Sequence, residues 1–139
     1  MQGRGRRLDL SMKLFERLHA SEGAWHIAFA LRNSLEGLRV AYRDETAFRQ
    51  VVLLSCVLAP LAFVVGRSFA ETAVLAGVCA VSLITELLNT AVESAIDRIS
   101  LERHPLSKKA KDCGSAAQFV AQLLILGVWS AVLVRNCFF

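Results

Sequence analysis

Four polar side chains suited to binding ions follow the apolar run 72–85. They are Glu86, Asn89, Glu93 and Asp97. A helix with 3.6 residues per turn places residues at these spacings along one stripe, so the four side chains face the same neighbour. Carboxylates on such a stripe can hold a hard cation such as Mg²⁺ together with phosphate oxygens, or they can mark a proton or cation pathway.

Placing these polar side chains in a membrane costs free energy, and the rest of this helix is apolar enough to lie in one. Asn89 alone is explained by hydrogen bonding between neighbouring helices, which averages only about 0.6 kcal/mol in a membrane protein. An acidic side chain inside a bilayer costs about 2.5 to 3.5 kcal/mol, unless it lies near the interface, is protonated, or has a partner. Glu86 and Glu93 therefore favour a functional site over polar packing.

The composition indicates a membrane protein. Of 139 residues, 55% are hydrophobic and only 20% are charged, whereas soluble domains carry about 25% charged residues. The apolar runs are 51–65, 72–85 and 114–134, and only the third reaches the roughly 20 residues that a spanning helix needs. Flanking residues must extend the first two. We predict an all-α integral membrane protein with spans at about 48–66, 71–99 and 113–135.

The basic residues predict the orientation of these spans. Five of them crowd the connection between the second and third spans: Arg98, Arg103, Lys108, Lys109 and Lys111. By the positive-inside rule this connection and the N-terminus are cytoplasmic. We read the net charge of +4 as attraction to anionic lipid, and we expect no nucleic-acid partner because no such module is visible.

The segment before the first span has a helical period. Apolar residues line one side of it and charged residues the other, which predicts an amphipathic helix at 26–45 lying in the membrane interface. The apolar side consists of Ile27, Leu31, Leu35, Leu38 and Tyr42. We therefore divide the chain into a basic N-terminal extension, 1–25, and a membrane-integral domain, 26–139.

Three motifs carry a resemblance to a known family. EGLRVAYRDETAFRQ, ELLNTAVESAIDRIS and HPLSKKAKDCGSAA resemble the signature of the small bacterial membrane-integral diacylglycerol kinases and of their relatives, the undecaprenol kinases. The resemblance runs from about Ser34 to the C-terminus. It implies a homotrimer in the bacterial inner membrane, with one interfacial helix and three spans per subunit. It also implies active sites shared between subunits at the cytoplasmic face, a membrane lipid as substrate, ATP as co-substrate and Mg²⁺ as cofactor.

The same resemblance implies roles for particular residues. Glu86 would be the general base that takes the proton of the lipid hydroxyl, and Glu45 and Glu93 would hold Mg²⁺. The residues assigned to ATP are Asn89, Asp97, Glu102, His104, Lys111 and Asp112. The residues assigned to the lipid are Ser34, Arg39, Phe48, Arg49, Gln50 and Ser115. Because the sequence contains neither a P-loop nor a protein-kinase catalytic loop, the expectation of ATP use rests on the resemblance.

Two alternatives remain open at this point. Val51 stands where diacylglycerol kinases usually carry glutamate and undecaprenol kinases do not, so undecaprenol is an alternative substrate; AFRQ and KDCGSAA favour diacylglycerol. A small transporter or channel subunit is less favoured, because the acidic stripe gathers at the cytoplasmic end and the third span has no matching charge.

Overall fold

The computed structural model describes residues 25–138. The predicted basic extension, 1–25, lies outside the described residues except for Trp25. The described chain is entirely helical apart from its connections, which confirms the predicted all-α class. A helical stretch at 25–44 is followed by α2 (Thr46–Val65), α3 (Phe69–Ile99) and α4 (Pro105–Phe138). These three helices are each long and apolar enough to cross a membrane, as predicted.

The chain divides into two compact units, Met1–Arg39 and Val40–Phe139. In the first unit, the described residues 25–39 are helical. Their apolar side chains, among them Ile27, Leu31 and Leu35, are exposed.

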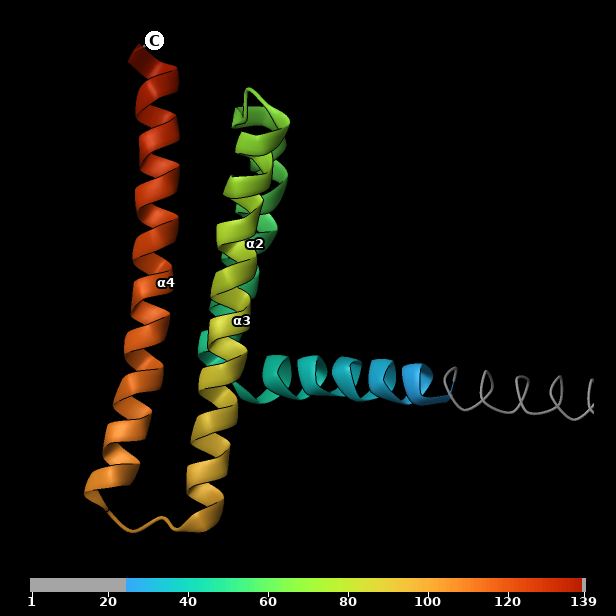
Figure 1. Cartoon of the computed structure of the whole chain (residues 1–139), viewed down its shortest axis with the longest axis vertical. Helices are drawn as coiled ribbons and strands as arrows, with labels where there is room; N and C mark the ends of the chain where they lie inside the picture. The colour runs from blue at the N-terminus through green and yellow to red at the C-terminus, as the bar shows by residue number, and fades with distance from the viewer. Residues whose placement is uncertain (1–24, 139) are drawn as a thin grey trace, which may run out of the picture. The chain divides into compact units, whose positions relative to one another are not determined.

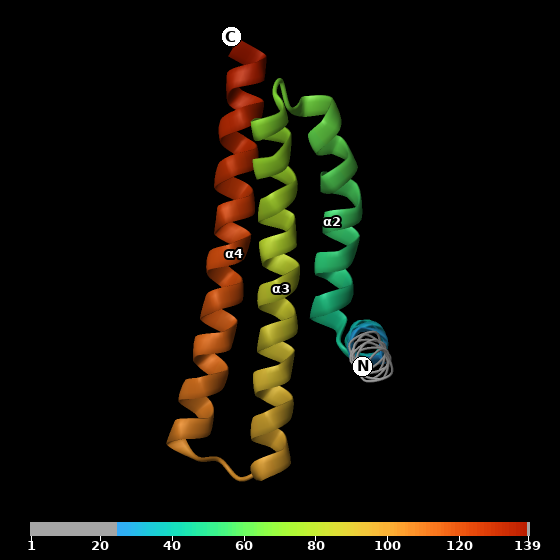
Figure 2. The same ribbon diagram turned by 45° about the vertical axis from the view of Figure 1, so that its right-hand side comes forward.

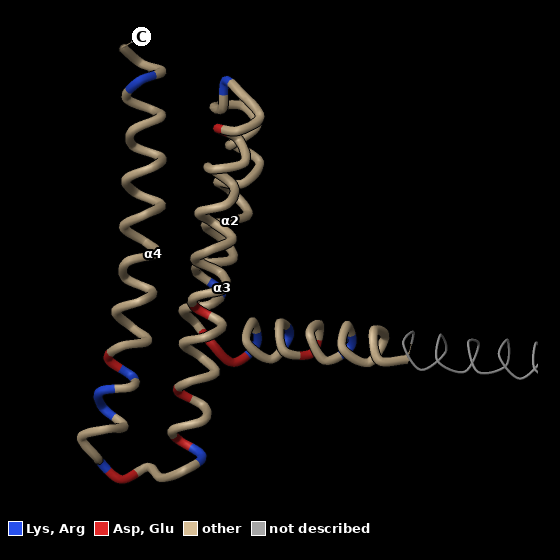
Figure 3. Tube along the Cα trace, viewed as in Figure 1, with Lys and Arg blue, Asp and Glu red and all other residues tan. Residues whose placement is uncertain are grey.

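In the second unit, α3 is the central helix. It packs along α2 on one side and along α4 on the other, whereas α2 and α4 make little direct contact (Figures 1 and 2). Glu86 lies about midway along α3, and the other charged residues of this unit lie toward the ends of the three helices (Figure 3). The stretches 50–66, 72–85 and 113–134 contain no Lys, Arg, Asp or Glu, as expected for segments in contact with hydrocarbon.

Glu71 links the helices at the end of the bundle where α2 joins α3. Its Oε2 accepts a hydrogen bond from the backbone N–H of Arg67 at 2.7 Å, and its Oε1 pairs with Nη1 of Arg135 in α4 at 2.6 Å. Asn136 of α4 donates to the carbonyl of Val65, the last residue of α2, at 2.8 Å. These contacts join all three helices at this end.

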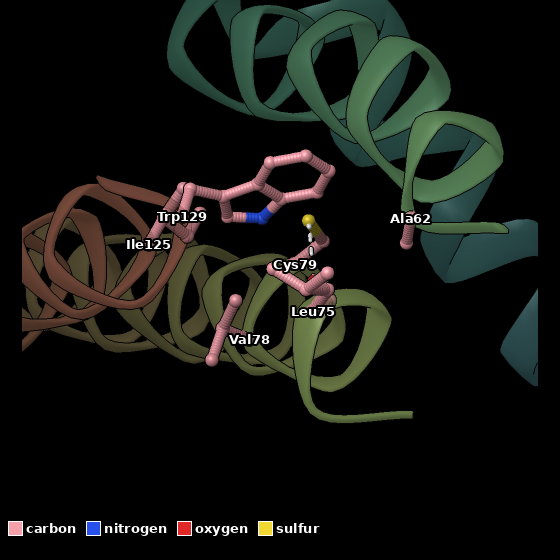
Figure 4. Close-up of a cluster of buried hydrophobic side chains, with 6 residues drawn as sticks. All are labelled: Ala62, Leu75, Val78, Cys79, Ile125 and Trp129. Atoms are coloured by element: carbon pink, nitrogen blue, oxygen red, sulfur yellow. Dashed lines mark hydrogen bonds between the residues drawn. The ribbon is translucent and has the colours of Figure 1, made fainter. Parts of the chain in front are cut away.

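The apolar core lies near the same end. Figure 4 shows the indole of Trp129, from α4, beside Cys79 of α3, with Leu75 and Ala62 close by. Leu75 and Ala62 are 0% exposed. The core therefore fixes how α3 is rotated against its two neighbours, and so decides which of its residues face them.

The helices differ in length, and this creates the space for a site. α2 has 20 residues and α3 has 31. Because both leave the same short turn, the start of α2 lies level with about Leu88 of α3, at a rise of 1.5 Å per residue. The last turns of α3 and the first turns of α4 thus continue past the beginning of α2.

Candidate functional site

Three predicted carboxylates meet where α2 begins. Glu86 of α3 is only 4% exposed. Glu45 immediately precedes α2, and Glu93 lies two turns along α3 from Glu86; both are half-buried. The negative charges of Glu93 and Glu45 both act on the carboxyl group of Glu86. Within residues 25–138, Glu86 has no ion pair. The structure thus brings together the proposed base and the two proposed metal ligands.

The carboxylates suit one mode of metal binding. Within residues 25–138, no group of three or more His, Cys, Asp or Glu side chains is arranged to hold a metal ion. Mg²⁺, however, is commonly held by one or two carboxylates together with substrate phosphates and water. Glu45 and Glu93 fit that mode, in which the phosphates supply the remaining oxygens.

Asn89 lies between Glu86 and Glu93 on the same stripe. Its Nδ2 donates to Oε1 of Glu93 at 3.2 Å. Its Oδ1 is buried and has no hydrogen-bond partner among the described residues. Gly114 of α4 faces Asn89, and a Cβ added at Gly114 would collide with Oδ1 of Asn89. Gly114 therefore allows α4 to approach Asn89 closely.

Gly114→Ala is expected to lower activity more than stability. The added methyl collides mainly with the end of a side chain, so Asn89 can rotate away, and in doing so it loses its hydrogen bond to Glu93. We expect about a tenfold loss of kcat, equivalent to about 1.4 kcal/mol, with a small change in thermal midpoint. Gly127→Ala is the matched control, because a Cβ at Gly127 has no atom within 4 Å in the described chain. Equal activities of the two variants would contradict this role for Gly114.

A pocket of about 640 Å³ lies between the last turn of α3 and the first turns of α4. Lys111 reaches across it to Asp97, with Nζ and Oδ1 at 2.6 Å, while Lys108 pairs with Asp112 one turn away on α4. At the start of α4, Nδ1 of His104 accepts the backbone N–H of Leu106 at 3.2 Å. The residues predicted for ATP that line this pocket are Asp97, Glu102, His104, Lys111 and Asp112.

Asn89, the sixth residue predicted for ATP, lies elsewhere. It is eight residues before Asp97 on α3, or about 12 Å along the helix axis, and belongs with the carboxylates. The site therefore has two parts, a carboxylate cluster and a pocket lined by both acidic and basic side chains. The pocket lies at the connection between α3 and α4, and the carboxylate cluster lies next to it along α3.

The residues predicted for the lipid differ in burial and fall in both compact units. Phe48 is 3% exposed and packs inside the bundle, as does Val51 at 5%, whereas Gln50 and Ser115 are exposed. Ser34 and Arg39 lie in the other compact unit, and both are exposed. Phe48 and Val51 thus shape the packing of α2 on the bundle rather than its outer surface.

Arg49 holds the chain where α2 begins. Its Nη1 donates to the carbonyls of Arg43 and Tyr42 at 2.8 and 3.2 Å, and its Nη2 donates to Oγ1 of Thr46 at 2.7 Å. Beside it, the hydrogen bond from Arg43 lowers the pKa of Asp44. Arg49 therefore fixes the backbone that carries Glu45.

One group of polar side chains was not predicted as a group. Ser82, which lies on the α3 stripe, accepts hydrogen bonds from Gln118 and Gln122 of α4, each at 3.1 Å. The sequence signal is a pair of glutamines four residues apart within the apolar run 114–134. Their partner on α3 could not be read from the sequence, because the pairing depends on how the two helices are rotated against each other.

The fold and the site define a class of protein. Three apolar helices carry a carboxylate cluster in which Glu86 is buried, and α3 continues from this cluster to a polar pocket against α4 that suits a charged ligand. This is the arrangement of a multi-pass membrane enzyme that brings an apolar substrate and a charged one together.

Comparison with known proteins identifies the family. The chain belongs to the prokaryotic diacylglycerol kinase family, whose sequence model matches residues 32–133. It is 53% identical to a diacylglycerol kinase of Pseudomonas aeruginosa over 112 residues, which cover 81% of this chain and 91% of that protein. The identity to the diacylglycerol kinase of Haemophilus influenzae is 40%, covering 84% and 98% of the two chains. For the Escherichia coli K12 enzyme it is 39%, covering 80% and 91%. The predicted family is confirmed.

Proposed function

We propose that this protein is an ATP- and Mg²⁺-dependent lipid kinase that converts diacylglycerol to phosphatidic acid at the cytoplasmic face of the bacterial inner membrane. The observation that carries the proposal is Glu86. It is a buried carboxyl group with no cationic partner among residues 25–138, it lies with Glu45 and Glu93, and its helix, α3, continues into a polar pocket. Membership of a family whose relatives are named diacylglycerol kinases supports the choice of substrate.

Glu86 lies at the depth in the membrane at which the hydroxyl group of a lipid alcohol is expected. About 20 residues of helix cross the hydrocarbon layer, and 20 residues counted from Phe69 end at Leu88. Glu86 thus falls at the boundary where hydrocarbon meets headgroups. The hydroxyl of diacylglycerol lies at this depth because its two acyl chains remain in the hydrocarbon. Asp97 lies eleven residues further along α3, about 16 Å away, where a water-soluble nucleotide has access.

The chemical step follows from this placement. Glu86 accepts the proton of the lipid hydroxyl as the hydroxyl oxygen forms a bond to the γ-phosphorus of ATP. The bond from that phosphorus to the β,γ-bridging oxygen breaks, and ADP leaves. Catalysis of this kind rests on positioning and charge neutralisation. Mg²⁺ held by Glu45 and Glu93 would neutralise charge on the phosphates.

The nucleotide binds in the pocket between α3 and α4. Lys111 changes partner from Asp97 to a phosphate when ATP enters, and Asp112 and His104 line the same space. Asn89 holds Glu93 in position through its 3.2 Å hydrogen bond. Glu93 is four residues from Asp97, about 6 Å along α3, so an extended triphosphate that contacts Lys111 reaches the Glu93 end of the carboxylate cluster.

Lys111→Gln is expected to raise the KM for ATP by about tenfold or more, because a hydrogen bond to a charged group contributes about 1.5 to 3 kcal/mol. The KM for the lipid should change little. Lys109→Gln is the matched control, because Lys109 is an exposed lysine of the same turn that does not belong to the pocket lining formed by the described residues. Steady-state kinetics measure the KM for ATP with ATP varied at saturating lipid, and the KM for the lipid with the lipid varied at saturating ATP. An unchanged KM in the Lys111 variant would remove this residue from the nucleotide site.

The enzyme is a homotrimer with active sites completed between subunits. Only 17% to 28% of the most apolar stretch of each helix is buried within the chain, which leaves wide apolar faces for neighbouring subunits and lipid. The N-terminus is cytoplasmic, and the helix at 26–45 lies in the membrane interface with its exposed apolar side chains toward the lipid. Native mass spectrometry in detergent tests the trimer, and a dimer or monomer of full activity would contradict it.

A kinase assay tests the function itself. Purified protein is supplied with ATP and either dioctanoylglycerol or undecaprenol, with and without Mg²⁺. We expect Mg²⁺-dependent phosphorylation of dioctanoylglycerol to exceed that of undecaprenol. A higher kcat/KM for undecaprenol would make this chain an undecaprenol kinase, which the buried valine at position 51 would suit. Absence of phosphorylation of either lipid would reject the kinase.

A further inference from the structure

A polar cluster crosses the interface between α3 and α4. Ser82 of α3 is 0% exposed. Its Oγ accepts hydrogen bonds from Nε2 of both Gln118 and Gln122 of α4, each at 3.1 Å. We call these three residues the Ser82–glutamine cluster. Both glutamines are only half-buried, so the cluster has a buried base and an accessible side.

The cluster has unused hydrogen-bonding capacity. Each carboxamide carries two N–H groups, and among residues 25–138 each glutamine nitrogen has Ser82 as its hydrogen-bond partner. Oε1 of Gln118 is buried without a partner in the same part of the chain. If the carboxamide of Gln118 is turned over, Ser82 can donate to its oxygen, and its NH₂ group then points away without an acceptor. In either orientation a polar group of the cluster lacks a partner in an apolar region.

An unpartnered polar group at such a place favours a ligand of complementary polarity. A purely structural cluster would satisfy its own members, because a buried polar group without a hydrogen bond destabilises the protein. With the Gln118 carboxamide turned over so that Ser82 donates to its oxygen, the NH₂ group of Gln118 and the second N–H of Gln122 are donors that need an acceptor. The surrounding apolar residues of α3 and α4 do not supply one, because the backbone carbonyls of both helices are used within the helices.

The position of the cluster identifies the kind of acceptor. Ser82 lies four residues from Glu86, one turn deeper into the membrane-spanning part of α3. About 20 residues counted back from Phe138 reach Phe119, so Gln118 and Gln122 also lie near the boundary of the hydrocarbon layer. The ester groups that join acyl chains to glycerol lie at this boundary. In diacylglycerol, the hydroxyl and the nearest ester are on adjacent carbon atoms, which matches two protein groups one helical turn apart.

We propose that the Ser82–glutamine cluster binds an ester carbonyl of the acylglycerol substrate, with Gln118 and Gln122 as donors. This inference rests on the proposed function and adds the basis of lipid selection. The carbonyl anchored by the cluster places the neighbouring hydroxyl at Glu86. A polyisoprenol has a hydroxyl but no carbonyl, so it leaves the glutamines unpartnered and is selected against.

The test compares two substrates that differ only in these carbonyls. Dioctanoylglycerol has two ester groups, and 1,2-dioctylglycerol has ether links in their place with the same free hydroxyl. The parent enzyme is expected to prefer the ester by about tenfold in kcat/KM. The double variant Gln118→Met/Gln122→Met keeps the side-chain length but removes the donors. Its kcat/KM for the ester should fall about tenfold, with the ether little affected, so that the preference disappears.

Thr85→Val is the matched control. It removes another hydroxyl at the same depth of α3, whose only hydrogen bond within the described chain is to its own helix, at the carbonyl of Val81 (2.8 Å). Its preference for the ester should equal that of the parent. This control shows whether loss of any polar group at this depth changes lipid selection.

The other outcomes separate this inference from the proposed function. If the parent phosphorylates both lipids equally, or the double variant keeps the preference for the ester, the ester-binding role is overturned and the kinase stands. If the double variant loses activity equally on both lipids and melts at a lower temperature, the cluster is only structural, which also overturns the inference. If the parent phosphorylates neither lipid, both proposals fail.

Discussion

Glu86→Gln is expected to lower kcat for lipid phosphorylation by about 10² to 10⁴, the usual contribution of a positioned general base. Glutamine keeps the shape of the side chain and its capacity for hydrogen bonds, but it cannot accept the proton of the lipid hydroxyl. The fold should persist. Glu86 is 4% exposed and has no ion pair among residues 25–138, so an amide removes the cost of burying a charge and breaks no pair.

The measurement combines specific activity with the thermal midpoint and the oligomeric state of one preparation. Glu71→Gln provides a control with the opposite signature. Glu71 is also a carboxylate of α3, but it pairs with Arg135 at 2.6 Å at the other end of the helix. Its amide should lower the thermal midpoint and leave the activity per folded molecule near the parent value. A well-folded Glu86→Gln enzyme with near-parental activity would exclude Glu86 as the base.

The fold was largely predictable because hydrophobic runs determine where helices cross a membrane. The runs 51–65, 72–85 and 114–134 each lie within one of the observed helices. α4 begins at Pro105, eight residues before residue 113, where the third span was predicted to start. Hydropathy marks the part of a helix that suits hydrocarbon, whereas the helix itself continues into the polar region, where proline is favoured in the first turn.

The contents of the site were predictable in part. The 3.6-residue period placed Glu86, Asn89 and Glu93 on one stripe, and they do share a face of α3. That Glu45 lies beside them depends on the different lengths of α2 and α3, which the sequence indicates only once the turn at Gly66 is located. The pocket between α3 and α4 likewise depends on where the connection between these helices turns.

Contacts between helices were beyond prediction from one sequence. Gln118 and Gln122 read as two polar residues in an apolar run, and nothing in their spacing selects Ser82 as the partner. The pairing follows from the rotation of α4, which is fixed by the packing of Trp129 against Cys79 and by the closeness that Gly114 allows. Packing of this kind depends on the shapes of both surfaces rather than on the period of either.

The last prediction concerns the metal. Glu93→Gln is expected to raise the Mg²⁺ concentration required for half-maximal activity by at least about tenfold, or to abolish turnover, because an amide oxygen is a weaker ligand than a carboxylate for a hard cation. Oε1 of the glutamine can still accept the hydrogen bond that Asn89 donates to Glu93 in the parent, at 3.2 Å. The substitution therefore changes the ligand more than the local structure.

Activity is measured against Mg²⁺ concentration at fixed ATP, and Mn²⁺ binding in the presence of a non-hydrolysable ATP analogue is followed by electron paramagnetic resonance. The second measurement does not depend on turnover, so it separates loss of the metal from loss of chemistry. Glu71→Gln, which removes a carboxylate from the distant end of α3, should leave both curves unchanged. Glu86→Gln should bind Mn²⁺ like the parent while failing to turn over. If Glu93→Gln also keeps the parental Mg²⁺ and Mn²⁺ curves, Glu93 is not a metal ligand, and its hydrogen bond with Asn89 serves only to position α3.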